Sequence, residues 1–517
     1  MKNASDIQSD LKKLVSGTAL AFGGTVIGNG VVYLLGVVMG RFLGAEVVGL
    51  YFMGLVIMQI AAAVSRMGMA EGILRFVPVY VSSQDYGKAR GTILLAVMMG
   101  GSLSVLTAGM LFFLSPWLSM HFVKNMNLSY YIRWFALALP LFTVGVLLFN
   151  AIQSLKRMDL VVIARDLVQP LTLLGLALIF FRFRPKPVSF LSAHFFSVVL
   201  ALLVALYFLR RSAMHVEEAK SNEFPWKSLM VFSIPIGCSD MAYYLFRWSD
   251  TFLLSYFRSA AEVGVYNAAL RTTLILNLLA ASCTALYAPI IAEHYHHGRS
   301  QEVQMILCTM IRWCLSLTIP IVFAMAFLSK DILSLWGPEF VEGSNALIIL
   351  GLCQLISIPT ILLSFTLLMC GKQVIEFGNV IAVTAVNITM NLFFIPRYGI
   401  NGAAVSMLAS QLIACAVRLG ELRSILAVQP YSPKYFKPVL ACVPVFLLFV
   451  LLQSYITKIA VTVSFGSQIG SMGALCILVV GGYYLTLYFL GFEDEDLVLW
   501  QEIRNRRSAE TCAQSRG

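Results

Sequence analysis

The sequence predicts an all-α membrane protein with about fourteen transmembrane helices. Of its 517 residues, 59% are hydrophobic and only 12% are charged, and the mean hydropathy is +0.82. A soluble domain carries about 25% charged residues. Apolar stretches of about 20 residues, the length that crosses a bilayer, recur along the whole chain. The connections between them are too short to fold as a soluble catalytic module.

The fourteen candidate spans are separated by short polar segments. The turn that separates the eleventh span from the twelfth contains Pro396, Gly399 and Asn401. The candidate spans are residues 17–39, 47–66, 92–115, 131–152, 162–181, 188–209, 229–256, 263–288, 307–328, 344–369, 374–394, 401–420, 437–456 and 469–490.

Charge sets the expected orientation. The net charge is +11 and the pI is about 9.1. If both termini face the cytoplasm, most Lys and Arg residues fall in cytoplasmic segments, as the positive-inside rule requires. The basic excess therefore indicates membrane topology and not a nucleic-acid partner.

Two segments of similar sequence lie at corresponding places in the chain. Residues 45–51 (AEVVGLY) resemble residues 261–266 (AEVGVY), and each segment opens the second span of a group of six. An even number of spans per group gives both groups the same orientation, which is a parallel repeat. The sequence thus predicts two pseudo-symmetric six-helix lobes, 1–211 and 228–424. Two appended helices (434–490) and a cytoplasmic tail (491–517) follow them.

Two such lobes leave a cleft between them, and rocking of one lobe against the other is the alternating-access mechanism of many transporters. The architecture therefore favours a transporter over an enzyme.

Three stretches carry a resemblance to a known family: residues 40–51, 261–271 and 396–404. They are similar to the Wzx-like polysaccharide biosynthesis flippases of the multidrug/oligosaccharidyl-lipid/polysaccharide exporter superfamily. The resemblance covers nearly the whole chain. It implies that a lipid-linked oligosaccharide is flipped from the cytoplasmic to the outer leaflet of the bacterial inner membrane. It also implies contact with membrane lipids, possible cooperation with polysaccharide polymerase machinery, and a monomer.

Charged residues in the seventh and eighth spans are the main candidates for the substrate site. Charges at membrane depth are costly unless they face protein or a water-filled cavity. Asp240, Tyr243, Arg247 and Asp250 share one helical face. In the eighth span, Arg271 follows Asn267 by one turn, and no acid lies three or four residues from it. We expect these residues to form a substrate-binding surface; a structural Arg247–Asp250 ion pair is the alternative.

Arg271 and Arg247 lie at similar depths, about 12 Å from the outer end of their spans at 1.5 Å per residue. They are therefore expected to approach each other. Because the resemblance implies a polyprenyl pyrophosphate lipid, the two guanidinium groups suit its phosphates, which Arg binds bidentately.

The first lobe offers polar but uncharged candidates. Asn29 in the first span and Gln59 in the second can bind sugar hydroxyls, or can simply make interhelical hydrogen bonds. The glycine cluster Gly23, Gly24, Gly28 and Gly30 predicts close helix packing or bending.

A polar loop at the cytoplasmic mouth provides a candidate gate. It contains Arg66, Glu71 and Arg75, and the last two are four residues apart. A solvated surface pair is the alternative. We expect no metal site and no cofactor: the cysteines lie in apolar segments, and His294, His296 and His297 lack further ligands at fixed spacing. Coupling to a proton, to Na⁺ through Asp240 or Asp250, or to the membrane potential stays open.

Three other functions are weighed against the flippase. A cation-coupled multidrug exporter of the same superfamily usually holds an acid in its first span, which is charge-free here from Val15 to Gly40. A lipid II flippase is richer in arginine across both lobes. A membrane glycosyltransferase or polymerase needs a larger outer loop than this chain has.

Overall fold

The computed structural model describes residues 4–212, 223–426, 436–442, 444 and 479–489, and these residues form helices joined by short connections, with no strand among them. The described part contains nine helices that are long and apolar enough to cross a membrane. The all-α membrane fold is therefore confirmed. The thirteenth and fourteenth predicted spans lie mostly outside the described residues, so the count of fourteen stays a prediction.

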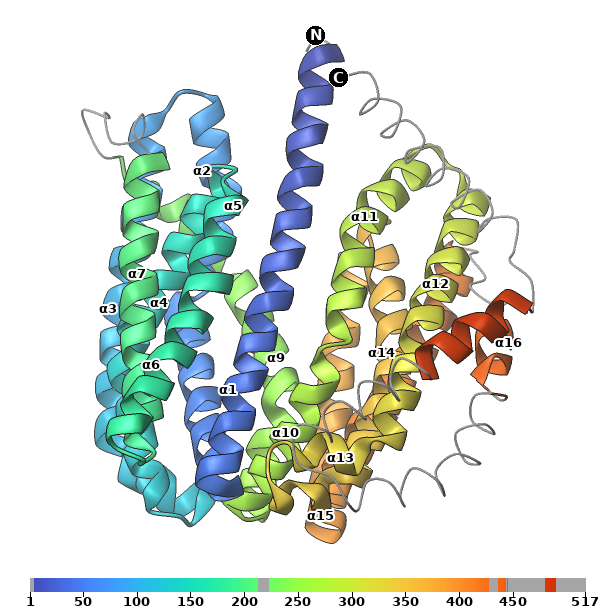
Figure 1. The fold of residues 1–517 in the computed structure, drawn as a ribbon. Coiled ribbons are helices and arrows are strands. Elements are labelled where there is room, and N and C mark those ends of the chain that lie inside the picture. Colours follow the sequence, from blue (N-terminus) through green and yellow to red (C-terminus); the bar gives the residue numbers. More distant parts are fainter. Residues whose placement is uncertain (1–3, 213–222, 427–435, 443, 445–478, 490–517) are drawn as a thin grey trace, which may run out of the picture. The chain divides into compact units, whose positions relative to one another are not determined.

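Figure 1 shows the helices in chain order. Their bounds are α1 Ala4–Arg66, α2 Met69–Ser82, α3 Tyr86–Leu118, η1 Ser119–Val123, α4 Asn127–Ser154, α5 Met158–Val161, η2 Val162–Val168, α6 Gln169–Phe183, α7 Val188–Ser212, α9 Trp226–Phe257, α10 Ala260–Leu274, α11 Asn277–His296, α12 Ser300–Phe327, α13 Ser329–Ser334, η3 Pro338–Gly343, α14 Ser344–Met369, α15 Gln373–Leu426 and α16 Phe436–Leu440.

Two of the long helices contain a sharp bend at a glycine where the sequence predicts separate spans. In α1 the bend is at Gly44 (φ 83°, ψ 173°), between the first and second predicted spans. In α15 it is at Gly399 (φ 57°, ψ −130°), within the predicted turn. Positive φ values suit glycine because it has no Cβ. Both predicted divisions are therefore present as backbone breaks.

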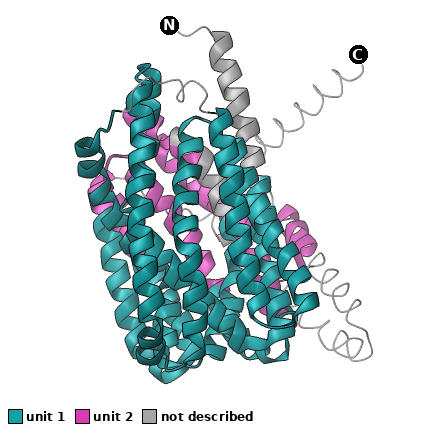
Figure 2. Cartoon of the chain, turned by 90° about the vertical axis from the view of Figure 1, so that its left-hand side faces the viewer, with its two compact units in different colours: residues 1–278, 329–350, 377–413 teal, residues 279–328, 351–376, 414–517 magenta. Residues whose placement is uncertain are grey.

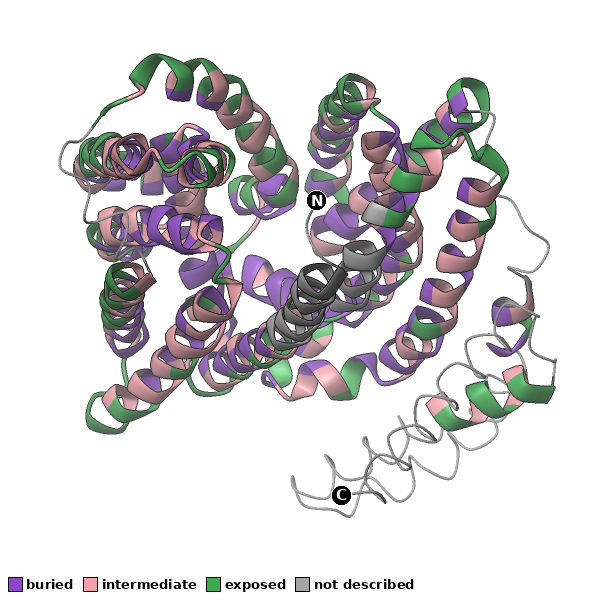
Figure 3. Cartoon of the chain, turned by 90° about the horizontal axis from the view of Figure 1, so that it is seen from above, coloured by how far each residue is buried: buried purple, intermediate pink, exposed green. Residues whose placement is uncertain are grey.

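The chain divides into two compact units (Figure 2). The first contains Met1–Leu278, Ser329–Leu350 and Phe377–Ile413, and the second contains Leu279–Leu328, Gly351–Glu376 and Ala414–Gly517. Within the first unit, α3, α4, α6 and α7 pack side by side. Buried residues lie where helices of a unit face one another (Figure 3). The lobe boundaries predicted from the sequence stay a prediction.

The two similar segments pack directly against each other in the first unit. Gly49 of α1 lies against the carbonyl of Ala260, and Gly264 of α10 lies against the carbonyl of Ala45. A Cβ at either glycine would collide with that carbonyl. Ala45 and Gly49 are each 215 residues before their counterparts Ala260 and Gly264. This reciprocal contact is the one that a pseudo-twofold axis between two parallel repeats would produce.

The predicted glycine packing in the first span is confirmed at two of its four positions. Gly24 and Gly28 lie against Val162 and the backbone of Asp166, whereas nothing lies near the Cβ positions of Gly23 and Gly30. The close approach brings α1 against η2. Helix α1 therefore reaches the side chains of η2 that the next section describes.

One prediction is wrong in its local structure. The segment from Glu71 to Arg75 is not a loop but part of helix α2. Its buried residues Met69, Ile73 and Val77 recur at helical spacing and lie on one face. Gly68 and Gly72 bring that part of the chain close to α9, where they approach the backbone and side chain of Ser233.

Candidate functional site

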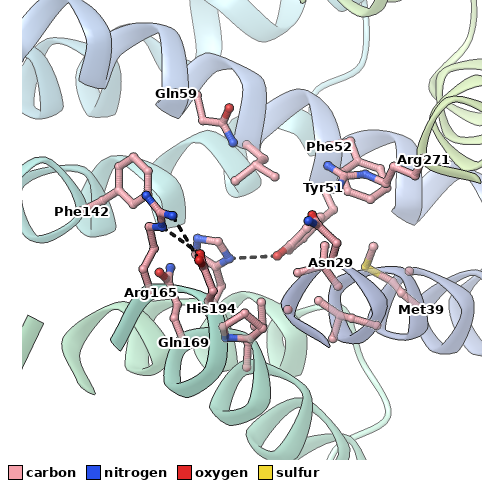
Figure 4. A pocket seen from close by; sticks show the side chains of 18 of the residues that line it. Asn29, Met39, Tyr51, Phe52, Gln59, Phe142, Arg165, Gln169, His194 and Arg271 are labelled. Carbon is pink, nitrogen blue, oxygen red and sulfur yellow. Dashed lines mark hydrogen bonds and ion pairs between the residues drawn. The ribbon is translucent and has the colours of Figure 1, made fainter. Parts of the chain in front are cut away.

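A pocket in the first unit contains three of the residues predicted to bind substrate. It has a volume of roughly 260 Å³ and is lined by residues of α1, α4, η2, α6, α7 and α10. Asn29, Gln59 and Arg271 all line it. Figure 4 shows their side chains around the same space.

Arg271 reaches this pocket from α10 and forms no ion pair with any residue that the structure describes. Its guanidinium lies over the ring of Phe52, 3.9 Å from the ring centroid. Its Nε atom is enclosed and has no hydrogen-bond acceptor within the described residues. Stacking on an aromatic face compensates part of the lost hydration of an arginine, but it leaves the N–H donors unfilled.

Arg247 lies close enough to Arg271 for their like charges to repel each other. It is exposed, and its guanidinium lies over the ring of Trp248 at 5.6 Å. Among the described residues, neither arginine forms an ion pair. The two arginines are therefore within electrostatic range of each other, and their joint role in binding substrate stays a prediction.

Asp250 belongs to a different, closed cluster. It is 6% exposed, and its two oxygens accept hydrogen bonds from Asn391 Nδ2 (2.6 Å) and from the hydroxyl of Tyr266 (3.0 Å). Asn387 links this cluster to Ser249 (2.6 Å). Asp250 is thus satisfied by neutral donors, and the alternative of a structural Arg247–Asp250 pair is not formed.

The remaining predicted site residues lie away from the pocket. Asn267 is fully buried and its Nδ2 donates to the carbonyl of Val263 (2.9 Å). Tyr243 is 51% exposed. Asp240 is half-buried and faces Glu71 and Arg66.

The three predicted gate residues have different surroundings. Arg66 is 7% exposed and donates to the hydroxyl of Tyr244 in α9 (3.3 Å). Glu71 faces Asp240, and one of its oxygens is enclosed with no hydrogen-bond donor among the described residues. Arg75 instead lies over the ring of Phe232, at 4.3 Å. All three therefore connect the start of the first repeat to α9.

The sequence matches the family model described as polysaccharide biosynthesis protein over residues 14–294, more than half of the chain. The chain belongs to this polysaccharide biosynthesis protein family. A second model, MatE, matches residues 235–393. The resemblance to the flippases of the exporter superfamily that contains both groups is therefore confirmed.

Two curated relatives align with only part of the chain. The probable low-salt glycan biosynthesis flippase Agl15 of Haloferax volcanii is 22% identical over 204 residues, which are 39% of this chain and 43% of Agl15. The capsular polysaccharide biosynthesis protein CapF of Staphylococcus aureus is 23% identical over 195 residues, 38% of this chain and 49% of CapF. The chain thus aligns with less than half the length of these relatives.

Solved structures share the fold over most of the chain. The inward-closed lipid II flippase MurJ superposes with a TM-score of 0.69 at 14% identity, covering 94% of this chain and all of MurJ. An inward-facing multidrug resistance transporter of the MATE family gives a TM-score of 0.63 at 13% identity, covering 80% of this chain and 94% of the transporter. At these identities the comparison establishes the two-lobe helical fold.

Sequence reasoning missed three pocket residues of this family member. Arg165 and Asp166, which lie in the candidate span 162–181 and were not proposed as site residues, are in the π-helical turn η2 and pair with each other at 2.8 Å. His194 lies in α7, where its Nδ1 is 2.9 Å from the hydroxyl of Tyr51. A signal was available, since Asp166 and His194 are polar residues within apolar stretches.

The second unit contains a contrasting buried charge. Arg418 donates to both carboxylate oxygens of Glu376, with an Nε–Oε2 distance of 3.0 Å, and both side chains are less than a tenth exposed. This bidentate geometry satisfies the two charges mutually. A buried arginine with such a carboxylate partner needs no ligand. Arg271, in contrast, has no carboxylate partner among the described residues. Among the described residues, no group of three or more His, Cys, Asp or Glu side chains is placed to hold a metal ion.

Proposed function

We propose that the protein is a transporter that flips a lipid-linked oligosaccharide from the cytoplasmic to the outer leaflet by alternating access. The glycan is carried on a polyprenyl pyrophosphate and serves O-antigen, capsule or exopolysaccharide export. The protein acts as a monomer in the bacterial inner membrane, with both termini cytoplasmic, and does not catalyse a reaction. A polysaccharide polymerase would use the flipped product.

The unpaired guanidinium of Arg271 carries this proposal. A guanidinium that is only partly exposed, and has no ionic partner among the described residues, is unfavourable at membrane depth, so a protein retains it where a ligand supplies the opposite charge. Arg247 adds a second cation nearby. A pyrophosphate has two neighbouring anionic groups, and it would relieve the repulsion between these arginines while it accepts their N–H donors.

The names of the relatives agree with this chemistry. Agl15 is described as a glycan biosynthesis flippase and CapF as a capsular polysaccharide biosynthesis protein. The match of residues 235–393 to the MatE model favours a multidrug exporter as the second candidate. A lipid II flippase of the same fold is a third. The cluster of uncharged polar groups beside Arg271 favours a glycan over a cationic drug, which Arg271 would repel.

Coupling is proposed to use a proton, Na⁺ or the membrane potential. Asp240 faces a second carboxyl group, that of Glu71, and the guanidinium of Arg66. Asp250 has both oxygens occupied by neutral donors. Asp240 is therefore the first carboxylate to test for proton coupling.

The test measures flipping of a polyprenyl pyrophosphate oligosaccharide by the purified protein in liposomes. Arg271→Ala is expected to lower the rate about 100-fold, because truncating one member of a desolvated charge pair costs about 2–5 kcal/mol. Arg271→Lys should lose roughly tenfold, since it keeps the charge but not the bidentate fork.

Arg182→Ala, which removes an exposed arginine at the end of α6, is the matched control and should flip at the normal rate. A normal rate for Arg271→Ala would refute the role of Arg271. A wild-type protein that exports a cationic drug but does not flip the lipid would replace the proposed function with the second candidate.

A further inference from the structure

The end of the pocket opposite Arg271 is polar but carries no net charge. Gln169 contributes an amide group there, and Asn29 and Gln59 contribute amide groups elsewhere in the lining. Among the described residues of this end, the ionised groups are Arg165 and Asp166, which are held together by two hydrogen bonds of 2.8 and 3.1 Å. Asp166 also accepts a hydrogen bond from Thr25 of α1 (3.3 Å). This end therefore presents both donors and acceptors without attracting an ion of either sign.

His194 gives this end one unfilled hydrogen-bonding position. The side chain is 6% exposed and lies among the rings of Tyr51 and Phe135. Its Nδ1 is engaged by the Tyr51 hydroxyl, while its Nε2 is enclosed and has no partner among the described residues. Buried polar atoms are nearly always hydrogen-bonded, so a buried nitrogen without a partner, on a residue that lines a pocket, marks a hydrogen bond that a ligand can complete.

The charged end and the neutral end are joined through consecutive residues. Tyr51 holds His194, and its neighbour Phe52 supports the guanidinium of Arg271. A molecule lying in this pocket therefore meets a cation at one end and a neutral imidazole with amide groups at the other. Figure 4 shows both ends, with Phe52 and Tyr51 near Arg271 and Phe142 near Arg165.

We propose that this pocket is a subsite for a glycosyl phosphate, with the phosphate at Arg271 and the first, uncharged sugar ring at His194 and Gln169. A sugar ring has hydroxyl groups that both donate and accept, and an apolar face that packs on aromatic side chains. The volume of roughly 260 Å³ lies below the usual range of pockets for drug-sized ligands, about 300–1,000 Å³, and so favours one ring over a whole oligosaccharide. His194 and Gln169 then discriminate between lipids by the sugar that is attached directly to the pyrophosphate. This inference rests on the proposed function and specifies the substrate group that the site recognises.

The test compares three lipids in liposomes that contain the purified protein: bare polyprenyl pyrophosphate, the same lipid with a single N-acetylhexosamine, and the same lipid with a single hexose. The wild type should flip at least one glycosylated lipid faster than the bare lipid. His194→Phe removes the Nε2 position while keeping a planar ring. It should lower the ratio of glycosylated to bare rates about tenfold, the value of one neutral hydrogen bond. The rate for the bare lipid is the reference of this ratio and is measured for each variant.

Three further variants separate the possible outcomes. His194→Gln, whose amide can place a polar group near the Nε2 position, should restore much of the ratio, whereas a purely structural role for the ring would not be rescued in this way. His121→Phe changes an exposed histidine of η1 and is the matched control. If His194→Phe does not fold, Gln169→Ala carries the same expectation.

An unchanged ratio in His194→Phe, or in Gln169→Ala where that variant is used, overturns the sugar subsite while leaving the proposed function intact. A wild type that flips none of the three lipids instead overturns the proposed function, and the subsite with it. A wild type that flips all three at equal rates overturns the subsite alone.

Discussion

The two repeats place a tyrosine at equivalent positions but give it different partners. Tyr51 in α1 and Tyr266 in α10 are 215 residues apart, as are the glycines Gly49 and Gly264 that pack their helices together. The hydroxyl of Tyr51 lies 2.9 Å from His194, whereas that of Tyr266 donates to Asp250 at 3.0 Å. The repeats thus share their backbone packing, and their polar chemistry has diverged.

The surroundings of these partners explain what the divergence does. Both oxygens of Asp250 are occupied by donors from within the protein. His194 lines a pocket and keeps one nitrogen open. The comparison teaches that a polar group inside the membrane is a functional candidate when a hydrogen-bonding position stays unfilled, and not merely because the group is polar.

Removing the Tyr266 hydroxyl should give the largest change in stability among the tests of this comparison. Tyr266→Phe leaves one oxygen of a buried carboxylate without its donor, and hydrogen bonds to charged groups contribute about 1.5–3 kcal/mol. The free energy of unfolding in detergent should fall by that amount. Tyr243→Phe, at an exposed tyrosine of α9, is the control and should change little. Equal stability of Tyr266→Phe and the control would show that Asp250 is satisfied without Tyr266.

The equivalent substitution in the first repeat, Tyr51→Phe, should lower the free energy of unfolding by a smaller amount. Tyr51→Phe removes a hydrogen bond between neutral groups, which contributes about 0.5–1.5 kcal/mol. The same unfolding measurement should therefore show a smaller loss than for Tyr266→Phe. His194 would also lose the hydrogen bond that orients its ring, so the preference for glycosylated lipid should weaken. A loss as large as that of Tyr266→Phe would contradict the contrast between a neutral pocket wall and a closed ionic cluster.

The fold was largely predictable from the sequence because its signals are local. Apolar length indicates the helices, and the positive φ at Gly44 and Gly399 falls where glycines interrupt two apolar runs. The repeated segment around Gly49 and Gly264 also indicated which parts of the chain are equivalent. Helix α2 was missed because the helix is short, has only one apolar face, and carries charged residues on its other faces.

The site was only partly predictable, because residues that contact each other in the folded protein can be far apart in the sequence. Such contacts produce no pattern at a fixed sequence spacing. Arg271, Asn29 and Gln59 stood out as polar residues in apolar runs, and they do line one pocket. Asp250 stood out equally, but its partner Asn391 lies 141 residues away. His194 and the Arg165–Asp166 pair depend on a π-helical turn and a distant tyrosine. Only the three-dimensional structure shows whether each polar group is already satisfied.

The smallest effect is expected at Asp85, a partly exposed carboxylate outside the membrane-spanning helices. Asp85 caps α3, and like Asp250 it accepts two hydrogen bonds, here from the backbone N–H of Lys88 (3.1 Å) and from its ammonium group (2.7 Å). The hydrogen bond from the Lys88 side chain holds the pKa of Asp85 below its usual value.

Because the folded state favours the ionised form of Asp85, the carboxylate contributes to the stability of the fold at neutral pH. This contribution to stability is lost as the pH falls through the lowered pKa. Asp85→Asn keeps a capping side chain but loses the charge. It should slightly weaken the hydrogen-exchange protection of the first turn of α3 at pH 7, and it should match the wild type once the pH is low enough to protonate Asp85. Solvent screens this exposed pair, so the difference should be well below that of Tyr266→Phe. A difference between Asp85→Asn and the wild type that persists at low pH would show that the amide disturbs the cap itself, and that charge is not what distinguishes the two side chains.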